Sequence, residues 1–185
     1  MKIAVYSGSF NPLHIGHQAI MEFLTRESGF DWVYLIVSPQ NPFKSSENNL
    51  TAESRYNAAV DAVLRHPDLH VWVDDIELSM DPPHYTIRTL DALKAREPEN
   101  DFTLIIGADN LSRFSKWKDY ERILSEYGTA VFPRTGYDME ELKSSLMEIN
   151  GDFRIELLDA PMVDISSTEI REGLAEGRDM SEYLM

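Results

Sequence analysis

Two histidines one helical turn apart end a short glycine turn near the start of the chain, Gly8-Ser-Phe-Asn-Pro-Leu-His-Ile-Gly-His17. The turn follows an apolar run, Ile3–Tyr6, and precedes a helical pattern, Gln18–Arg26. In α/β proteins such a turn binds phosphate, because backbone N–H groups and the positive end of the helix face the anion. The i, i+3 spacing of His14 and His17 puts both rings on one side of the helix start. As cations, the imidazoles would stabilise charge that develops at phosphorus, so the motif predicts chemistry on a phosphoryl group.

Gly16 lies between the two histidines and, without a side chain, would let a phosphate approach the backbone closely. Two other interpretations of the pair are open. The histidines could occupy a surface turn and have no functional role. They could also bind zinc, although helical zinc histidines usually sit at i, i+4 with a third ligand, and no third ligand is evident.

A second motif, Asp164-Ile-Ser-Ser-Thr-Glu-Ile-Arg171, opens the last predicted helix. Three consecutive hydroxyl residues can cap this helix: Ser166, Ser167 and Thr168. Ser166 with Glu169 fits a capping box, and Arg171, about one turn into the helix, could add a forked positive charge to a phosphate. Alone, the motif is an ordinary helix cap. Together with the first motif it predicts two anion sites, one for the reacting phosphate and one for the rest of a triphosphate.

Alternating apolar runs and helical patterns must position these motifs. The runs predict six strands: Lys2–Ser7, Trp32–Ser38, Leu69–Asp74, Thr103–Gly107, Thr129–Phe132 and Arg154–Leu158. The patterns predict six helices: His17–Arg26, Thr51–Arg65 with Thr51 as N-cap, Tyr85–Ala95, Asp119–Glu126, Met139–Ile149 and Thr168–Ala175. This alternation indicates a parallel sheet covered on both faces. We therefore predict one Rossmann-like α/β domain over residues 1–185, with a mainly parallel sheet flanked by helices.

Two predicted loops leave the carboxyl ends of strands, where open α/β sheets bind ligands. The first, Pro39–Asn49, is polar and carries Lys44, and the second, Ser79–His84, contains Pro82-Pro83 and leads into a helix. Both loops could therefore line the site.

The composition limits the class of protein. The 185 residues include 17 Lys and Arg against 32 Asp and Glu, a formal net charge of -15, and no cysteine. Disulfides, thiolate nucleophiles and cysteine metal sites are therefore excluded, and so acidic a surface argues against a nucleic acid polymer as partner. With no apolar stretch long enough for a membrane span and no signal pattern at the start, we expect a cytoplasmic protein without a membrane partner.

The two motifs together resemble those of the nucleotidylyltransferase superfamily, which has H-x-G-H after the first strand and S-S-T-x-x-R late in the chain. From Met1 to about Gly177 the chain is most similar to the bacterial nicotinate-nucleotide adenylyltransferases. The segments that carry this finer resemblance are Pro42-Phe-Lys44, Tyr85-Thr-Ile-Arg-Thr-Leu90, Gly107-Ala-Asp109, Trp117 and Arg134. Asn11 and Ser9 stand where that family usually has Asp and Thr, and both retain the local hydrogen-bonding capacity.

The resemblance implies a reaction in which ATP and nicotinate mononucleotide give deamido-NAD and pyrophosphate, and it implies roles for three sets of residues. His14, His17, Lys44 and Arg171 would act on the ATP phosphates as catalytic residues. The remaining ATP-binding residues would be Gly8, Ser9, Phe10, Gly16, Ser166, Ser167 and Thr168. The nicotinate nucleotide would be held by Thr86, Gly107, Asp109, Trp117 and Arg134. Mg²⁺ would arrive with ATP and would have few or no direct protein ligands.

Alternatives to these roles are open. Trp117 could be a partly buried aromatic residue, Asp109 and Thr86 could cap helices, and Lys44 and Arg88 could be solvated surface charges. The acceptor could be nicotinamide mononucleotide or pantetheine phosphate, and the transferred group could be cytidylyl. A protein of another class, a nucleotide sensor without catalysis, is also conceivable, although it would not need both histidines. The sequence is compatible with a homo-oligomer.

Overall fold

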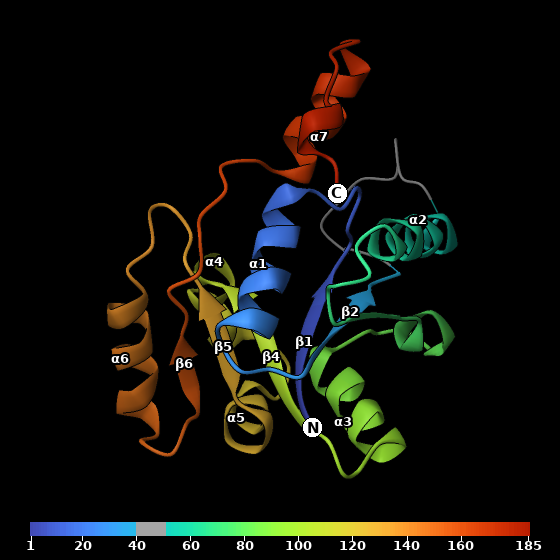
Figure 1. The fold of residues 1–185 in the computed structure, drawn as a ribbon. Coiled ribbons are helices and arrows are strands. Elements are labelled where there is room, and N and C mark those ends of the chain that lie inside the picture. The colour runs from blue at the N-terminus through green and yellow to red at the C-terminus, as the bar shows by residue number, and fades with distance from the viewer. Residues whose placement is uncertain (40–50) are drawn as a thin grey trace.

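Six parallel strands form one sheet in residues 1–39 and 51–185, the part of the chain that the computed structural model describes (Figure 1). Their order is β3-β2-β1-β4-β5-β6, and every neighbouring pair is parallel. The strands are β1 (Lys2–Gly8), β2 (Trp32–Val37), β3 (Val71–Asp74), β4 (Asp101–Gly107), β5 (Thr129–Phe132) and β6 (Ile155–Leu157). The α-helices are α1 (Ile15–Arg26), α2 (Ala52–Leu64), α3 (Thr86–Arg96), α4 (Ala108–Leu111), α5 (Tyr120–Arg122), α6 (Met139–Ile149) and α7 (Ser167–Ala175).

Helices cover both faces of the sheet, which explains why its strands are almost continuously apolar. Along β1, Ala4 and Tyr6 face one core, which includes apolar residues of α1 and α2. Ile3 and Val5 face the second core, which is closed by α3, α4 and α6. Full burial of each such side chain contributes about 1.5–3 kcal/mol to the free energy of unfolding.

The parallel α/β sheet is confirmed, and the six predicted strands differ from the observed ones by a few residues at their ends. The continuous α-helix predicted over residues 119–126 is wrong. A single α turn, α5, leads there into a π-helical turn, Ile123–Tyr127, which ends at Gly128 with a φ of 77°. Three 3-10 turns were not predicted: Ile76–Ser79, Phe114–Lys116 and Ser181–Tyr183. Such turns are too short to produce a helical period in the sequence.

The strand order reverses between β1 and β4, which are neighbours in the sheet although three connections separate them in the chain. The connections from their carboxyl ends leave toward opposite faces, and this opens a crevice of the kind that binds ligands in α/β proteins. α1 follows β1 and α4 follows β4, so both first turns lie at the crevice. Figure 1 shows α7 and the last residues of the chain at this same end, beside the start of α1. Among the described residues, no helix combines the length and apolar character that a membrane crossing requires.

Candidate active site

The two histidines hold the start of α1 together through their own side chains. His14 is the N-cap, and its Nδ1 accepts a hydrogen bond of 3.1 Å from the backbone N–H of Gly16. Nδ1 of His17 accepts a bond of 3.2 Å from the backbone N–H of His14. This is a reciprocal capping box in which imidazoles replace the usual hydroxyl and carboxylate.

These bonds determine where the proton of each ring is. A ring nitrogen that accepts a backbone N–H carries no proton, so a neutral ring keeps its proton on Nε2, where it can be donated to a ligand. Burial, with a smaller contribution from Arg134, lowers the pKa of His14 to about 4. Burial, then the neighbouring His14 and Arg134, holds the pKa of His17 well below its usual 6.5. In the protein without ligand these shifts favour the neutral form of both rings near pH 7, with Nε2–H as the donor. The expectation that the rings act as cations beside a reacting phosphate stays a prediction.

Aromatic side chains and close backbone packing fix the orientation of the pair. The ring of Phe10 meets that of His17 edge-on at 5.1 Å, and Tyr6 packs against Phe10 at 5.4 Å. A Cβ on Gly8 would meet the ring of Phe10 at 3.0 Å. A Cβ on Gly16 would lie 2.9 Å from Cε1 of His14, so glycine is needed here for the imidazole as well as for any phosphate.

The second motif lies directly against the first. Of the three candidate caps, Ser166 caps α7 by accepting the N–H of Glu169. The Glu169 carboxylate accepts from the Ser166 hydroxyl, where a capping box would have it accept from the Ser166 backbone N–H. Ser167 donates to the carbonyl of Pro12 at 3.0 Å. Arg171 donates to the carbonyl of Asn11 at 2.7 Å and to the hydroxyl of Thr168 at 3.2 Å. The first turn of α7 and the loop before α1 therefore form one unit.

A third group comes from the ends of β4 and β5. Gly107 is the N-cap of α4, and Asp109 lies inside this short helix, so the alternative that Asp109 caps it is wrong. Nε of Arg134 lies 3.8 Å from Oδ1 of Asp109, and the guanidinium lies 5.0 Å above the ring of Phe132. This Oδ1 is buried and accepts no hydrogen bond from the described residues. The charge of Arg134 also lowers the pKa of both histidines, so this group acts electrostatically on the pair.

Thr86 and Trp117, the residues predicted to hold the nicotinate ring, belong to neither motif and lie in the segments after β3 and β4. Tyr85 is the N-cap of α3 and Thr86 is its first residue, so Thr86 does not cap the helix. Trp117 is half-buried and packs on Phe114 with 4.8 Å between ring centroids. Within the described residues no hydrogen bond or ring contact joins either side chain to the histidine pair. Arg88 folds back onto the carbonyls of the preceding loop, and Lys44 lies outside the described residues.

The end of the chain lies beside His14, and no pattern in the sequence predicts this. Leu184 pairs with His14 in an isolated antiparallel bridge. Met185 is buried in the core beside α1 and α2, and its carbonyl accepts a bond of 2.7 Å from Arg65. Residues after Gly177 thus return to the site, and only the three-dimensional structure reveals this because neither residue carries a reactive group.

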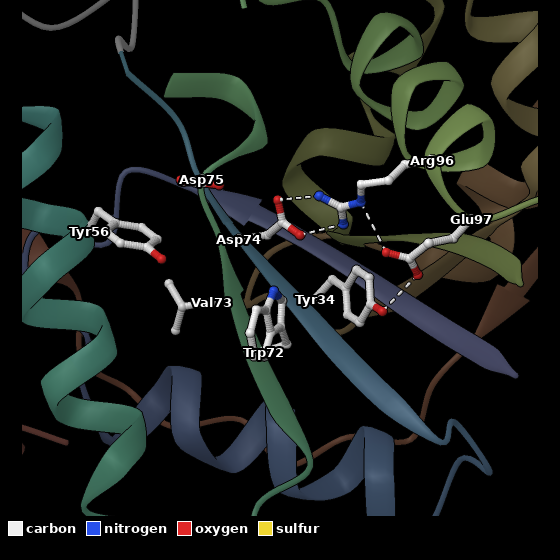
Figure 2. Close-up of a pocket in the computed structure, with 8 residues that line it drawn as sticks. All are labelled: Tyr34, Tyr56, Trp72, Val73, Asp74, Asp75, Arg96 and Glu97. Atoms are coloured by element: carbon white, nitrogen blue, oxygen red, sulfur yellow. Dashed lines mark hydrogen bonds and ion pairs between the residues drawn. The ribbon is translucent and has the colours of Figure 1, made fainter. Parts of the chain in front are cut away.

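A cavity of about 450 Å³ lies elsewhere, at the β3 edge of the sheet. Figure 2 shows Arg96 bridging Asp74 and Glu97 there, with the Tyr34 hydroxyl on Glu97, and none of the predicted site residues lines the cavity. In residues 1–39 and 51–185 no group of three His, Cys, Asp or Glu could hold a metal ion.

The chain is similar to known proteins over almost its whole length. The model of a family described as cytidylyltransferase-like matches residues 5–173. A protein of Bacteroides fragilis named probable nicotinate-nucleotide adenylyltransferase is 40% identical, over 99% of this chain and 87% of its own length. A protein of the same name from Porphyromonas gingivalis is 37% identical, over 100% and 89%.

Solved structures share the fold. Nicotinic acid mononucleotide adenylyltransferase of Plasmodium falciparum, complexed with NaAD, has a TM-score of 0.77 at 19% identity and covers 99% of this chain and 90% of its own. A putative nicotinate-nucleotide adenylyltransferase of Vibrio parahaemolyticus has a TM-score of 0.69 at 26% identity, over 100% and 93%.

Proposed function

Because the chain belongs to the cytidylyltransferase-like family and, within it, to the nicotinate-nucleotide adenylyltransferases, we propose that it transfers the adenylyl group of ATP to nicotinate mononucleotide. The products are deamido-NAD and pyrophosphate, and the reaction is a step of NAD biosynthesis. The observation that carries this proposal is the pair of imidazoles whose Nδ1 atoms accept backbone N–H groups and whose Nε2 atoms have no hydrogen-bond partner among the described residues.

The chemistry needs no protein nucleophile. An oxygen of the mononucleotide phosphate attacks the α-phosphorus of ATP, and the bond from this phosphorus to the β-phosphate oxygen breaks, so that pyrophosphate leaves. Nε2–H of His14 and of His17 donates to non-bridging phosphate oxygens, whose charge increases in the transition state. Because the rings are held by their own capping bonds, these donors need no reorientation when the charge develops.

Positive groups near His14 and His17 complement the negative charge of the triphosphate. The positive charge of Arg134 acts on both imidazoles. The first turn of α7 presents backbone N–H groups next to the loop before α1. Arg171 links α7 to the carbonyl of Asn11, and this bond orients the loop that faces the phosphates. Lys44 adds a further positive charge in this proposal. Mg²⁺ would enter with ATP and would neutralise phosphate charge, with few or no direct ligands from the protein.

The acceptor is held at the first turn of α3 and by Trp117. The N–H groups at the start of a helix attract a carboxylate, which nicotinate has and nicotinamide lacks. Trp117 is packed on Phe114 and half-buried, so it offers a fixed aromatic face for stacking on the pyridine ring. Asp109 would accept hydrogen bonds from ribose hydroxyls through Oδ1, which is buried and has no donor among the described residues.

Pyrophosphate release with separate acceptors tests the function. The purified protein is incubated with ATP and Mg²⁺ and with nicotinate mononucleotide, nicotinamide mononucleotide or pantetheine phosphate, one at a time. We expect rapid release with nicotinate mononucleotide and much slower release with the other two. Release with another acceptor but none with nicotinate mononucleotide would refute the assignment of the acceptor, and no release with any of them would indicate a sensor.

A further inference from the structure

A buried arginine outside both motifs joins the ends of two central strands. Arg55 lies in the first turn of α2 and is only 6% exposed. Its Nη1 donates to the carbonyl of Ser9 at 2.6 Å. Its Nη2 donates to the carbonyls of Ser38 at 2.8 Å and Pro39 at 3.0 Å. Ser9 follows β1 and Ser38 follows β2, so one guanidinium connects three elements at the carboxyl edge of the sheet.

Within the part of the chain that the structure describes, only backbone carbonyls balance the charge of Arg55. Burial lowers the pKa of its guanidinium, and no neighbouring charge contributes to this shift. Arg96, by contrast, makes a bidentate pair with the buried carboxylate of Asp74. A buried cation without a counterion destabilises a fold unless hydrogen bonds compensate. Arg55 therefore satisfies three carbonyls at the edge where a polyanion is proposed to bind, and it keeps its positive charge available there.

The bond to Ser9 also orients the next amide. In a trans peptide the C=O and the following N–H point in opposite directions. Since the carbonyl of Ser9 points inward to Arg55, the N–H of Phe10 points to the other side of the loop. Phe10 has a φ of 44°, and its N–H donates to no acceptor among the described residues. Outward amides next to a residue of positive φ form the kind of concave group that binds anions.

A second set of bonds keeps the end of β2 in register with this loop. The N–H of Ser38 donates to the carbonyl of Gly8 at 2.9 Å, and the Ser38 hydroxyl donates to the buried carboxylate of Glu77 at 2.7 Å. The position of Ser38 is therefore fixed independently of Arg55. The guanidinium links this fixed point to Ser9, in the turn that follows β1.

We propose that Arg55 is a positioning residue for adenylyl transfer, which holds the Ser9–Phe10 peptide so that its amide faces the phosphates of ATP, with the guanidinium charge on the far side of the same peptide. This role rests on the proposed function. It predicts a defect in the use of ATP that exceeds any effect on the acceptor.

The test compares Arg55→Met, which removes charge and donors, with Arg55→Lys, which keeps the charge but cannot reach both strand ends with a fork. Lys94→Met is the matched control. Lys94 also donates to two backbone carbonyls, those of Pro98 and Asn100, but these lie just before β4, at the amino ends of the strands. For each protein, Mg-ATP binding is measured by calorimetry without acceptor, and kcat and both KM values are measured with nicotinate mononucleotide. Thermal melting gives the folded fraction.

For Arg55→Met we expect Mg-ATP affinity to fall by about tenfold and kcat/KM for ATP by on the order of a hundredfold, because the phosphate-binding loop is misplaced. The KM for nicotinate mononucleotide should change by less than about threefold, since the ring site lies on other elements. Arg55→Lys should recover part of the ATP affinity, and Lys94→Met should match the wild type in every kinetic constant.

A folded Arg55→Met protein that binds and uses Mg-ATP like the wild type would overturn the proposal. So would a loss of activity in proportion to the loss of folded protein, because that is a purely structural effect. If Arg55→Met does not fold, wild-type ATP affinity and turnover in Arg55→Lys would overturn it instead. Mg-ATP binding is measured without acceptor, so the comparison of Arg55 variants by calorimetry does not depend on the acceptor. A wild-type protein that binds ATP but forms no dinucleotide would therefore refute the proposed function, and the calorimetry would still test the role of Arg55.

Discussion

The rings of His14 and His17 lie 3.7 Å apart between centroids, with 30° between their planes, and the backbone N–H of His14 donates to Nδ1 of His17. The i, i+3 spacing in the sequence thus becomes a close, tilted pair of rings that is part of the helix cap. Protonation of either Nδ1 would break a capping bond, so the pair is built to be neutral. This relationship connects the catalytic proposal to the stability of the fold, and both consequences can be measured.

Gly16→Ala should impair catalysis without weakening the fold. The added Cβ would meet Cε1 of His14 at 2.9 Å and Nδ1 at 3.0 Å, so the ring must move. Alanine favours the helix by roughly 0.5–1 kcal/mol relative to glycine, and displacement of the His14 ring weakens its capping bond to the Gly16 N–H by a comparable amount, so the melting temperature should change little. We expect kcat to fall by on the order of tenfold or more.

Gly151→Ala is the control for this change, because a Cβ there would meet nothing within 4 Å. Equal turnover for Gly16→Ala and Gly151→Ala would show that the position of the His14 ring does not limit the reaction.

The two histidines also predict a pH dependence of stability. Burial lowers the pKa of His14 to about 4, with Arg134 acting in the same direction and Glu169 opposing it. An unfolded histidine titrates near 6.5, so between about pH 4 and 6.5 the unfolded chain binds more protons than the folded protein. The free energy of unfolding must therefore rise with pH in this window, by up to about 1.4 kcal/mol per pH unit for each histidine.

Urea denaturation between pH 4.5 and 7.5 measures this slope. In His14→Asn the side-chain oxygen can still cap Gly16 but does not titrate, so the curve should become flatter than that of the wild type. Identical slopes in the two proteins would mean that His14 is not held neutral by the fold.

Trp117→Ala should weaken the binding of the acceptor selectively. If the indole stacks on the pyridine ring, its loss removes about 1–3 kcal/mol and should raise the KM for nicotinate mononucleotide by roughly 5- to 150-fold, with little change in the KM for ATP. Trp72→Ala is the matched control, because Trp72 is 58% exposed on β3, away from the proposed site. A KM for nicotinate mononucleotide that is the same in both variants would remove Trp117 from the ring site.

Much of the fold follows from the sequence, because buried parallel strands are continuous apolar runs and the helices that follow strands carry caps such as Thr51 and Ser166. The turn at Ile123–Tyr127 does not, since its wider winding depends on packing Ile123, Leu124 and Tyr127 into the core. Local sequence patterns record the helical period and cannot record such tertiary packing.

The same limit applies to the site. The spacing of His14 and His17 predicts that the rings share one side of the helix, but their neutral state depends on burial, which spacing does not reveal. Arg55 looks like one more charged residue of an amphipathic helix. Only the fold shows that it faces inward and that three carbonyls surround it.

The single-turnover rate of adenylyl transfer in His14→Asn and His17→Asn tests the central claim most directly. Asparagine places an oxygen near the position of Nδ1, so each variant can retain the capping bond while losing the Nε2–H donor. With saturating Mg-ATP and nicotinate mononucleotide, we predict that formation of deamido-NAD slows by on the order of 10²–10³-fold in each variant, while melting temperatures stay close to that of the wild type. A folded variant that forms deamido-NAD within about threefold of the wild-type rate would contradict the account, because the Nε2–H donor would then not stabilise the transition state.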